Sequence, residues 1–239
     1  LGATDPKAMM LRFHTQTGGS TLTAQQPMNN ISRVTIQTLA AVLGGTQSLH
    51  TNGYDEALSL PTEEAAGIAL RTQQIAAYES GVPDTADPLA GSYFVESLTH
   101  EVEQAAWKLI EKIDAMGGSV AAIEQGFIQN EIAKSAYEYQ KNIESGEKII
   151  VGINKFETDD EKKIPVFKID DSIQKSQVEK LTKFKNNRNH AKCDQVLQIL
   201  NDKATAGENI MPTVVEAVEN NCSLGEIADT LREIYGEYK

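Results

Sequence analysis

The amino-acid sequence predicts an α/β fold with a few parallel strands, followed by a mostly helical region. Two short β-like runs, Met10–Gln16 and Thr46–Asn52, flank one helical segment with short joints, which is typical of a right-handed βαβ unit. Residues after about 100 show mainly helical spacing of apolar side chains. About three strands are expected, and three parallel strands cannot close a barrel. We therefore expect further polypeptide, in cis or from a partner, to complete the sheet.

Residues 1–80 are expected to contain helices between and after the two strands. Asp5-Pro6 marks a turn ahead of the first strand. Apolar residues at helical spacing predict a helix over 30–43, and Gly44-Gly45 is a natural stop. Residues 55–60 resemble one short helical turn. Thr62 is then a candidate N-cap for a helix that ends at about Glu79.

Residues 81–155 begin with a loop rich in Pro, Gly and Asp over 81–91. Residues Ser92–Leu98 form a third, weaker strand candidate, and Thr99 is expected to cap a helix that carries its apolar residues on one face. The remaining expected elements are helices over 121–124 and 129–143 and a β-like run over Ile149–Asn154.

The composition of the chain changes near Asp170. Residues 158–163 are charged and are expected to form a solvated loop, and the sequence beyond Asp170 is rich in Lys, Asn, Gln and Glu with helical spacing. We interpret the latter as small helices that dock on the main body. The predicted regions are therefore 1–155, which holds the sheet and its helical extension, and 156–239, a linker and helices that pack on it.

The charge balance excludes some partners. The 239 residues are 40% hydrophobic and 23% charged, as in an ordinary globular protein, and 22 Lys and Arg against 34 Asp and Glu give a net charge of −12. Nucleic acids and anionic membranes require clustered cations, so we expect neither as a partner. No apolar run approaches the roughly 20 residues of a membrane span.

Cysteine use and the first residues indicate a cytoplasmic protein. Cys193 and Cys222 lie far apart without metal-ligand spacing, so two ordinary half-buried thiols in a reducing compartment are expected, with no metal site. Residues 1–7 show neither a basic start nor an apolar stretch, so no signal peptide is predicted. The first residue is not Met, which indicates a fragment or a processed chain.

Alternation along the two strands places polar side chains on common faces. Arg12, His14 and Gln16 share one face of the first run. The corresponding face of the second run consists of Ser48, His50 and Asn52. Barrel interiors usually hold branched apolar residues, so these faces predict a polar cavity with a ligand. The alternative is that both faces simply meet solvent. The glycines after Gln16, in Thr17-Gly18-Gly19-Ser20, permit close approach of backbone to a ligand.

A series of motifs carries a family resemblance along the whole chain. In order, these are HTQTGG, LTAQQPxNN, GGTQSLHTN, DEALxLPTE, RTQQ, DPLAGSYFVE, MGG followed by AIExG, and VGINKF. Together they resemble the large (alpha) chain of the methylmalonyl-CoA mutase family of coenzyme B12-dependent acyl-CoA mutases. Several long motifs in fixed order are far more specific than any one of them.

The resemblance implies the last strands of a (β/α)8 TIM-type barrel, followed by a mostly helical C-terminal region. It also implies adenosylcobalamin as cofactor, with the cobalt ligand supplied by another domain or chain, and a radical 1,2-rearrangement of an acyl-CoA, most simply methylmalonyl-CoA to succinyl-CoA. The implied partners are the acyl-CoA substrate, a cobalamin-binding domain or small subunit, and the remaining barrel strands. An oligomer is expected, and this chain alone is expected to be inactive.

The resemblance also assigns candidate cofactor-binding residues. His14 and Gln16 match the strand end beside the corrin and the substrate, and Thr17 and Gly19 match the adjoining loop. Asn52 and Glu56 match the pair that holds the ribose hydroxyls of the adenosyl group, and Ser59 matches a further cofactor contact. A carboxylate and an amide four residues apart can grip a vicinal diol.

Each assignment has a simpler alternative. Glu56 is also explained as a carboxylate favoured at a helix start. His14, a possible catalytic residue, and His50 are also explained as histidines hydrogen-bonded to a neighbour. The catalytic residues are otherwise expected in the N-terminal strands that this sequence lacks.

The sequence departs from the family pattern at several points. The cobalt-ligating Asp-x-His-x-x-Gly motif is absent, and Gly18 and Met28 stand where methylmalonyl-specific members often have Ser and Tyr. An isobutyryl-CoA or hydroxyisobutyryl-CoA mutase subunit is therefore an alternative. A non-catalytic assembly subunit, with a dimer contact from residues 170–239, and an unrelated parallel-sheet enzyme are the other hypotheses.

Overall fold

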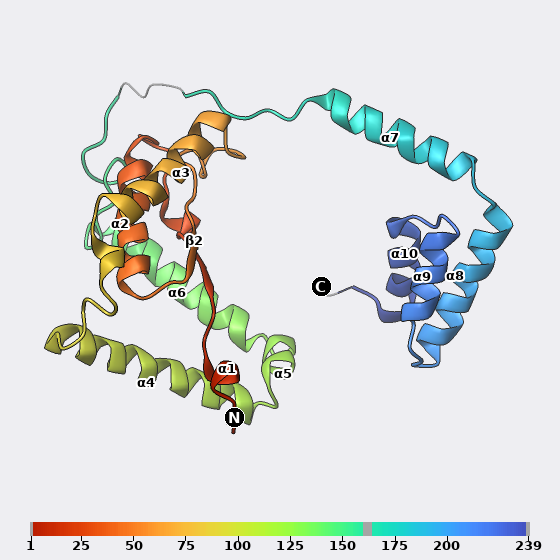
Figure 1. Cartoon of the computed structure of the whole chain (residues 1–239), viewed down its shortest axis with the longest axis horizontal. Coiled ribbons are helices and arrows are strands. Elements are labelled where there is room, and N and C mark those ends of the chain that lie inside the picture. The colour runs from red at the N-terminus through yellow and green to blue at the C-terminus, as the bar shows by residue number, and fades with distance from the viewer. Residues whose placement is uncertain (1, 160–163, 238–239) are drawn as a thin grey trace. The chain divides into compact units, whose positions relative to one another are not determined.

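The structure, a computed structural model, describes residues 2–159 and 164–237 (Figure 1). The chain divides into two compact units, residues 1–168 and 169–239. Each unit has buried residues of its own. The expected boundary at 155 and the docking of residues 156–239 on the first region remain predictions.

The first unit contains one parallel strand pair among its described residues. β1 (His14–Gln16) pairs with β2 (Ser48–His50), with His14 opposite Ser48 and Gln16 opposite His50. α2 (Asn29–Leu43) connects the two strands, so the predicted βαβ unit is confirmed. Both strands are shorter than predicted, because the backbone pairing between them covers only three residues of each strand. Upstream, for example, the Phe13 backbone N–H donates to the Gln47 side-chain Oε1 at 3.1 Å instead of to a strand.

Two helices predicted from their spacing and caps are confirmed. α2 buries Val34 and Thr38 and stops at Gly44-Gly45, where Gly45 has a positive φ of 81°. α3 (Glu63–Tyr78) packs against α2 (Figure 1). Its N-cap is Thr62, whose Oγ1 accepts a hydrogen bond from the Ala65 N–H at 3.2 Å.

Short helical pieces accompany these elements. They are α1 (Pro6–Met9) and the 3-10 turns η1 (Gly19–Thr21) and η2 (Val82–Asp84). Residues 55–60 form hydrogen-bonded turns, including an i to i+4 bond from the Ser59 N–H to the Asp55 carbonyl at 3.1 Å. The described residues contain a two-stranded sheet, and the partial barrel implied by the resemblance remains a prediction.

The predicted strand over Ser92–Leu98 and the predicted cap at Thr99 are wrong. α4 (Tyr93–Ala115) begins directly after Ser92 and continues without a break. Thr99 lies inside it, and its hydroxyl donates to the Val95 carbonyl at 2.8 Å. A short apolar run such as Tyr93-Phe94-Val95 fits a strand and a helix equally well by periodicity. Its side chains are largely exposed, so no sheet contact favours the strand.

The helices that follow are confirmed, but the β-like run after them is not a strand. α5 (Ser119–Glu124) and α6 (Phe127–Glu144) match the predicted segments. Residues 149–154 contain only an isolated bridge between Val151 and Lys155. The Asn154 side chain explains this, because it accepts from the Ile150 N–H and donates to the Ile143 and Lys148 carbonyls, each at 2.8 Å. Of the expected loop over 158–163, residues 160–163 lie outside the described residues.

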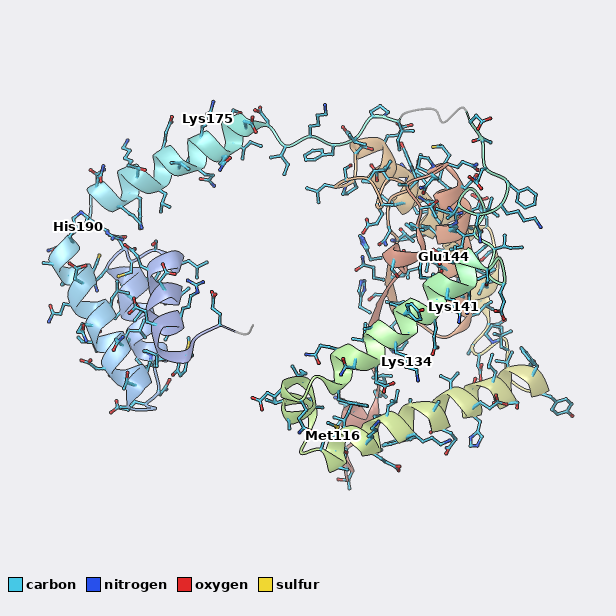
Figure 2. All side chains as sticks on the ribbon, turned by 180° about the vertical axis from the view of Figure 1, so that it is seen from behind. Met116, Lys134, Lys141, Glu144, Lys175 and His190 are labelled. Carbon is cyan, nitrogen blue, oxygen red and sulfur yellow. The ribbon has the colours of Figure 1, made fainter. Side chains whose placement is uncertain are left out.

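The second unit is helical, as predicted. Its helices are α7 (Asp171–Asn186), α8 (His190–Thr205), α9 (Met211–Glu219) and α10 (Leu224–Tyr235). α8 packs against α9 and α10, and Figure 2 marks its first residue, His190, and Lys175 on α7. The core of this unit consists of Cys193, Val196, Leu200, Ala217, Cys222 and Ile227.

A polar network fixes the start of α10. Ser223 and Glu226 form a capping box, in which each side chain bonds the backbone N–H of the other. Arg188, whose side chain is 6% exposed, donates to the Glu226 carboxylate with both terminal nitrogens. The Arg188 guanidinium and the Ser223 hydrogen bonds hold the pKa of Glu226 well below its usual range.

In the part of the chain that the structure describes, we find no helix that is long and apolar enough to cross a membrane.

Candidate functional site

The site lies where the two parallel strands end. One residue past β1, the Thr17 N–H donates to the His50 carbonyl at 3.0 Å. Thr17 then holds Asn52, whose backbone N–H donates to Thr17 Oγ1 at 3.0 Å and whose Nδ2 donates to the Thr17 carbonyl at 3.2 Å. Thr17 is 5% exposed and Asn52 2% exposed. The amide of Asn52 is therefore fixed at the carboxyl end of the sheet.

Polar side chains from the two predicted faces are hydrogen-bonded to each other. His14 Nδ1 and Ser48 Oγ share a hydrogen bond of 2.7 Å, and Gln16 Nε2 donates to Asn52 Oδ1 at 2.9 Å. His14 and Gln16 are exposed. One face of the strand pair therefore presents a polar surface that leads to the Asn52 amide.

Gly19 makes room for two side chains at this strand end. A Cβ atom on Gly19 would lie 2.7 Å from Asn52 Nδ2 and 3.2 Å from Glu56 Oε1. The Glu56 side chain is exposed, and among the described residues no hydrogen bond or ion pair to its carboxylate is found. The unpaired Glu56 carboxylate and the fixed Asn52 amide therefore both lie against the backbone of Gly19.

A rigid turn carries Glu56. The neighbouring Asp55 is fully buried, and its Oδ2 accepts a hydrogen bond from the Thr62 N–H at 2.8 Å. The Asp55 carbonyl also accepts from the Leu58 and Ser59 N–H groups. Asp55 Oδ1 has no partner among the described residues and would lie 2.6 Å from a Cβ on Gly53. Asp55 and Gly53 together thus set the backbone that presents Glu56.

Asn30 is a supporting residue that the sequence analysis missed. It is fully buried on α2; its Oδ1 accepts from the Thr23 N–H at 3.1 Å, and its Nδ2 donates to the Thr23 and Tyr54 carbonyls at 2.8 and 2.9 Å. Arg33 also donates to Asn30 Oδ1, at 2.7 Å. Asn30 therefore ties the loop after β1 to the loop after β2. The sequence signal for this role was the Asn29-Asn30 pair at the start of the helix.

Ser59 is placed differently from the other candidates. Its hydroxyl donates to the Leu60 carbonyl at 2.8 Å and accepts from the Phe167 N–H at 3.2 Å. Neither hydrogen bond involves Asn52 or Glu56. The structure therefore brings together Gln16, Thr17, Gly19, Asn52 and Glu56, and leaves Ser59 in contact with the end of the first unit.

A pocket of about 210 Å³ adjoins this site. His50, Thr51, Gly53 and Glu56 line one side of it, and α3 lines the other. Nearby, burial and the Glu64 and Asp55 carboxylates raise the pKa of Tyr54, which keeps its phenol protonated. A larger pocket of about 580 Å³ lies elsewhere, between α2, Tyr139 and residues 149–151, and contains none of the predicted site residues.

Metal chemistry has no obvious ligand set here. Within residues 2–159 and 164–237, no group of three or more His, Cys, Asp or Glu side chains is placed to hold a metal ion. The site residues are suited instead to hydrogen bonding with hydroxyl and amide groups.

Comparison with known proteins decides the family. The family model described as methylmalonyl-CoA mutase matches residues 1–237. The chain belongs to the methylmalonyl-CoA mutase family. Mitochondrial methylmalonyl-CoA mutase of Mus musculus is 46% identical over 98% of this chain. The 2-hydroxyisobutanoyl-CoA mutase large subunit of Aquincola tertiaricarbonis is 43% identical over 100% of it, and methylmalonyl-CoA mutase of Rhizobium meliloti (strain 1021) is 42% identical over 97%.

The chain spans only part of these methylmalonyl-CoA mutase family members. It covers 31% of the mouse protein, 43% of the Aquincola subunit and 33% of the Rhizobium protein. Membership in the family confirms the resemblance seen in the motifs.

Proposed function

We propose that this chain supplies the cofactor-facing wall of an adenosylcobalamin-dependent acyl-CoA mutase, formed by the last strands of a (β/α)8 barrel. The reaction is a radical 1,2-rearrangement of the carbon skeleton, with methylmalonyl-CoA and succinyl-CoA as the first candidate pair. One observation carries the proposal: the unpaired Glu56 carboxylate lies beside the fixed Asn52 amide across Gly19. Family membership gives this arrangement its chemical context.

The residues present fit an adenosyl group. An amide has two donor hydrogens and two acceptor lone pairs. Asn52 uses one donor toward Thr17 and one lone pair toward Gln16, which leaves one of each for a ligand. Glu56 adds acceptor oxygens that form charge-assisted hydrogen bonds with hydroxyl groups. Asn52 and Glu56 would therefore hold the vicinal ribose hydroxyls.

The remaining candidates orient and enclose the group. When bound, adenosylcobalamin supplies the radical that starts the rearrangement, and the protein contributes binding and orientation. Thr17 and Gly19 shape the loop that would contact the cofactor. His14, whose Nδ1 lies 2.7 Å from Ser48 Oγ, would lie beside the corrin and the substrate, and we propose it as a candidate catalytic residue. The Ser59 hydroxyl is already hydrogen-bonded to two backbone groups, so we propose that it makes only a peripheral contact with the cofactor.

The proposed reaction needs partners. A cobalamin-binding domain or small subunit would supply the cobalt ligand, and further strands would complete the barrel around the acyl-CoA. The Aquincola relative is named a large subunit, which supports an assembly of more than one chain. We propose that this chain acts within such an oligomer and is inactive by itself.

A second acyl substrate is supported by specific observations. The chain is 43% identical over its whole length to a 2-hydroxyisobutanoyl-CoA mutase large subunit. Gly18 and Met28 also differ from the residues often found in methylmalonyl-specific members. A branched hydroxyacyl-CoA, or isobutyryl-CoA, is therefore the alternative substrate.

The test is anaerobic isomerisation by the assembly that contains this chain, with and without adenosylcobalamin. Methylmalonyl-CoA, isobutyryl-CoA and 2-hydroxyisobutyryl-CoA are compared in parallel. Cofactor-dependent turnover of one substrate is the expected result and names the acyl group. An assembly with a complete barrel and a cobalamin domain that turns over none of them would contradict the proposal and favour a non-catalytic subunit.

A further inference from the structure

The two cysteines of the chain lie next to each other in the core of the second unit. Cys193 is fully buried and Cys222 is 6% exposed. The Cys222 Sγ lies 3.9 Å from the Cys193 carbonyl oxygen, to which its thiol donates a hydrogen bond. The Cys193 Sγ donates to the Asn220 carbonyl at 3.0 Å. Residues 29 positions apart in the sequence are therefore in contact within one buried cluster.

The two thiols lie in different backbone settings, one in a helix and the other in a turn. Cys193 lies in the first turn of α8, which holds its backbone in place. Cys222 lies between α9 and α10, in a turn where Asn221 has a positive φ of 65°. A disulfide needs a specific separation and orientation of the two Cβ atoms. A turn residue can reach that geometry with a smaller rearrangement than a residue within a helix.

We propose that Cys193 and Cys222 are an oxidation site, at which a peroxide converts the two thiols to an intramolecular disulfide. One thiolate attacks a peroxide oxygen, which breaks the O–O bond, forms a sulfenic acid and releases water. The second thiol then attacks that sulfur, the S–S bond forms and the S–O bond breaks with loss of a second water. The two thiols lose two electrons and two protons, and hydrogen peroxide is reduced to two waters.

The surroundings of the thiols set the rate of this oxidation. Burial and the neighbouring Cys193 thiol raise the pKa of Cys222 to about 11. Because only the thiolate is nucleophilic, the reaction is slow at neutral pH. The rate should increase about tenfold per pH unit below that pKa, since the thiolate fraction increases by that factor. The proposed disulfide forms without the cofactor or the substrate.

The test treats the folded 239-residue chain with hydrogen peroxide at pH 7 and pH 9. Samples are then unfolded, alkylated and weighed by mass spectrometry. We expect a monomer that has lost two hydrogens and in which neither thiol can be alkylated. Dithiothreitol should restore both thiols. After proteolysis, the peptides that contain residues 193 and 222 should be linked by a disulfide. Because the chain has two cysteines, no other intramolecular disulfide can give this product. Intact thiols, oxygen added to the separate sulfurs, or disulfide-linked dimers alone would overturn the proposal.

Two variants identify the bonded residues, and a melting measurement tests whether the folded chain accommodates the bond. Cys193→Ser and Cys222→Ser must each abolish the monomeric product. The oxidised wild-type chain should also melt at a higher temperature than the reduced chain, because the bond restricts the unfolded state over a 29-residue separation. A lower melting temperature after oxidation would mean that the native packing has to break to form the bond.

Discussion

Gly19 and Gly18 are adjacent in sequence but meet different surroundings. A Cβ on Gly19 would lie 2.7 Å from Asn52 Nδ2, whereas the nearest atoms to a Cβ on Gly18 are 3.9 Å away. Asn52 cannot easily withdraw, because Gln16 and Thr17 hold its side chain through hydrogen bonds. The space at Gly19 is therefore required by the site, and the space at Gly18 is not.

This difference predicts the outcome of a matched pair of substitutions. Gly19→Ala should lower the free energy of unfolding by about 1–3 kcal/mol, the scale of overpacking, and displace the Asn52 amide. Gly18→Ala should change the free energy of unfolding by less than about 0.5 kcal/mol, as for an uncrowded position. Urea unfolding of both variants measures the effect. Equal stability of the two variants would show that Asn52 moves freely.

Individual site residues were predictable to the extent that they follow local rules. Strand alternation predicts that Gln16 and Asn52 share a face, and their hydrogen bond confirms it. The role of Asn30 could not be predicted in this way. Its partners are backbone groups of Thr23 and Tyr54, which come together only when two separate loops meet.

Among the helices, the start of α10 concentrates several interactions on one side chain. Glu226 accepts hydrogen bonds from Arg188 and from the Ser223 hydroxyl and backbone N–H. Its pKa is held low in the folded chain, so the folded chain binds this proton less readily than the unfolded chain. The stabilisation is therefore complete above the ordinary Glu pKa of about 4.3 and is lost as the pH falls below it.

Removing this carboxylate should weaken the second unit in a pH-dependent way. We expect Glu226→Gln to lower the free energy of unfolding by about 1.5–3 kcal/mol at pH 7, the scale of hydrogen bonds to charged groups. The deficit relative to wild type should shrink between pH 5 and pH 3, because the wild type loses its advantage there. Glu233→Gln, on the exposed side of the same helix, is the control and should show little change at either pH. A constant deficit across this range would contradict the account.

Element types were predicted best where capping and periodicity agree. Thr62, helical spacing and a first turn with Glu63 and Glu64 all indicated α3, which begins where expected. The start of α4 was misassigned because its first turn has a strand-like composition and its cap lies at Ser92. The run over 149–154 was misassigned because the Asn154 side chain takes the place of a strand partner.

The whole molecule contains two units with separate cores. The second unit buries Cys193, Val196, Leu200, Ala217 and Ile227 among its own helices. Residues 169–239 should therefore fold without the first unit. Circular dichroism of this fragment is expected to show a helical spectrum and a cooperative thermal transition. A fragment that lacks helical structure would show that its core depends on the rest of the chain.

The described residues of the first unit form a sheet of two strands, and the sequence predicted a sheet too small to close a barrel. Two parallel strands do not form a stable layer without cover on both faces. The sequence could not identify what supplies that cover, because strand and helix periodicity describes only the residues of this chain. The relatives, of which this chain covers 31–43%, provide the context for proposing a barrel around the site.

We propose that Glu56 and Asn52 hold the adenosyl group. The most direct test is adenosylcobalamin affinity of the assembly that contains this chain, measured by spectroscopic titration for wild type, Glu56→Ala and the control Glu63→Ala. We predict that Glu56→Ala weakens binding by about 1.5–3 kcal/mol, or about 10- to 150-fold, and that Glu63→Ala, at an exposed position on α3, leaves it unchanged. Wild-type affinity in the Glu56→Ala assembly would contradict the claim.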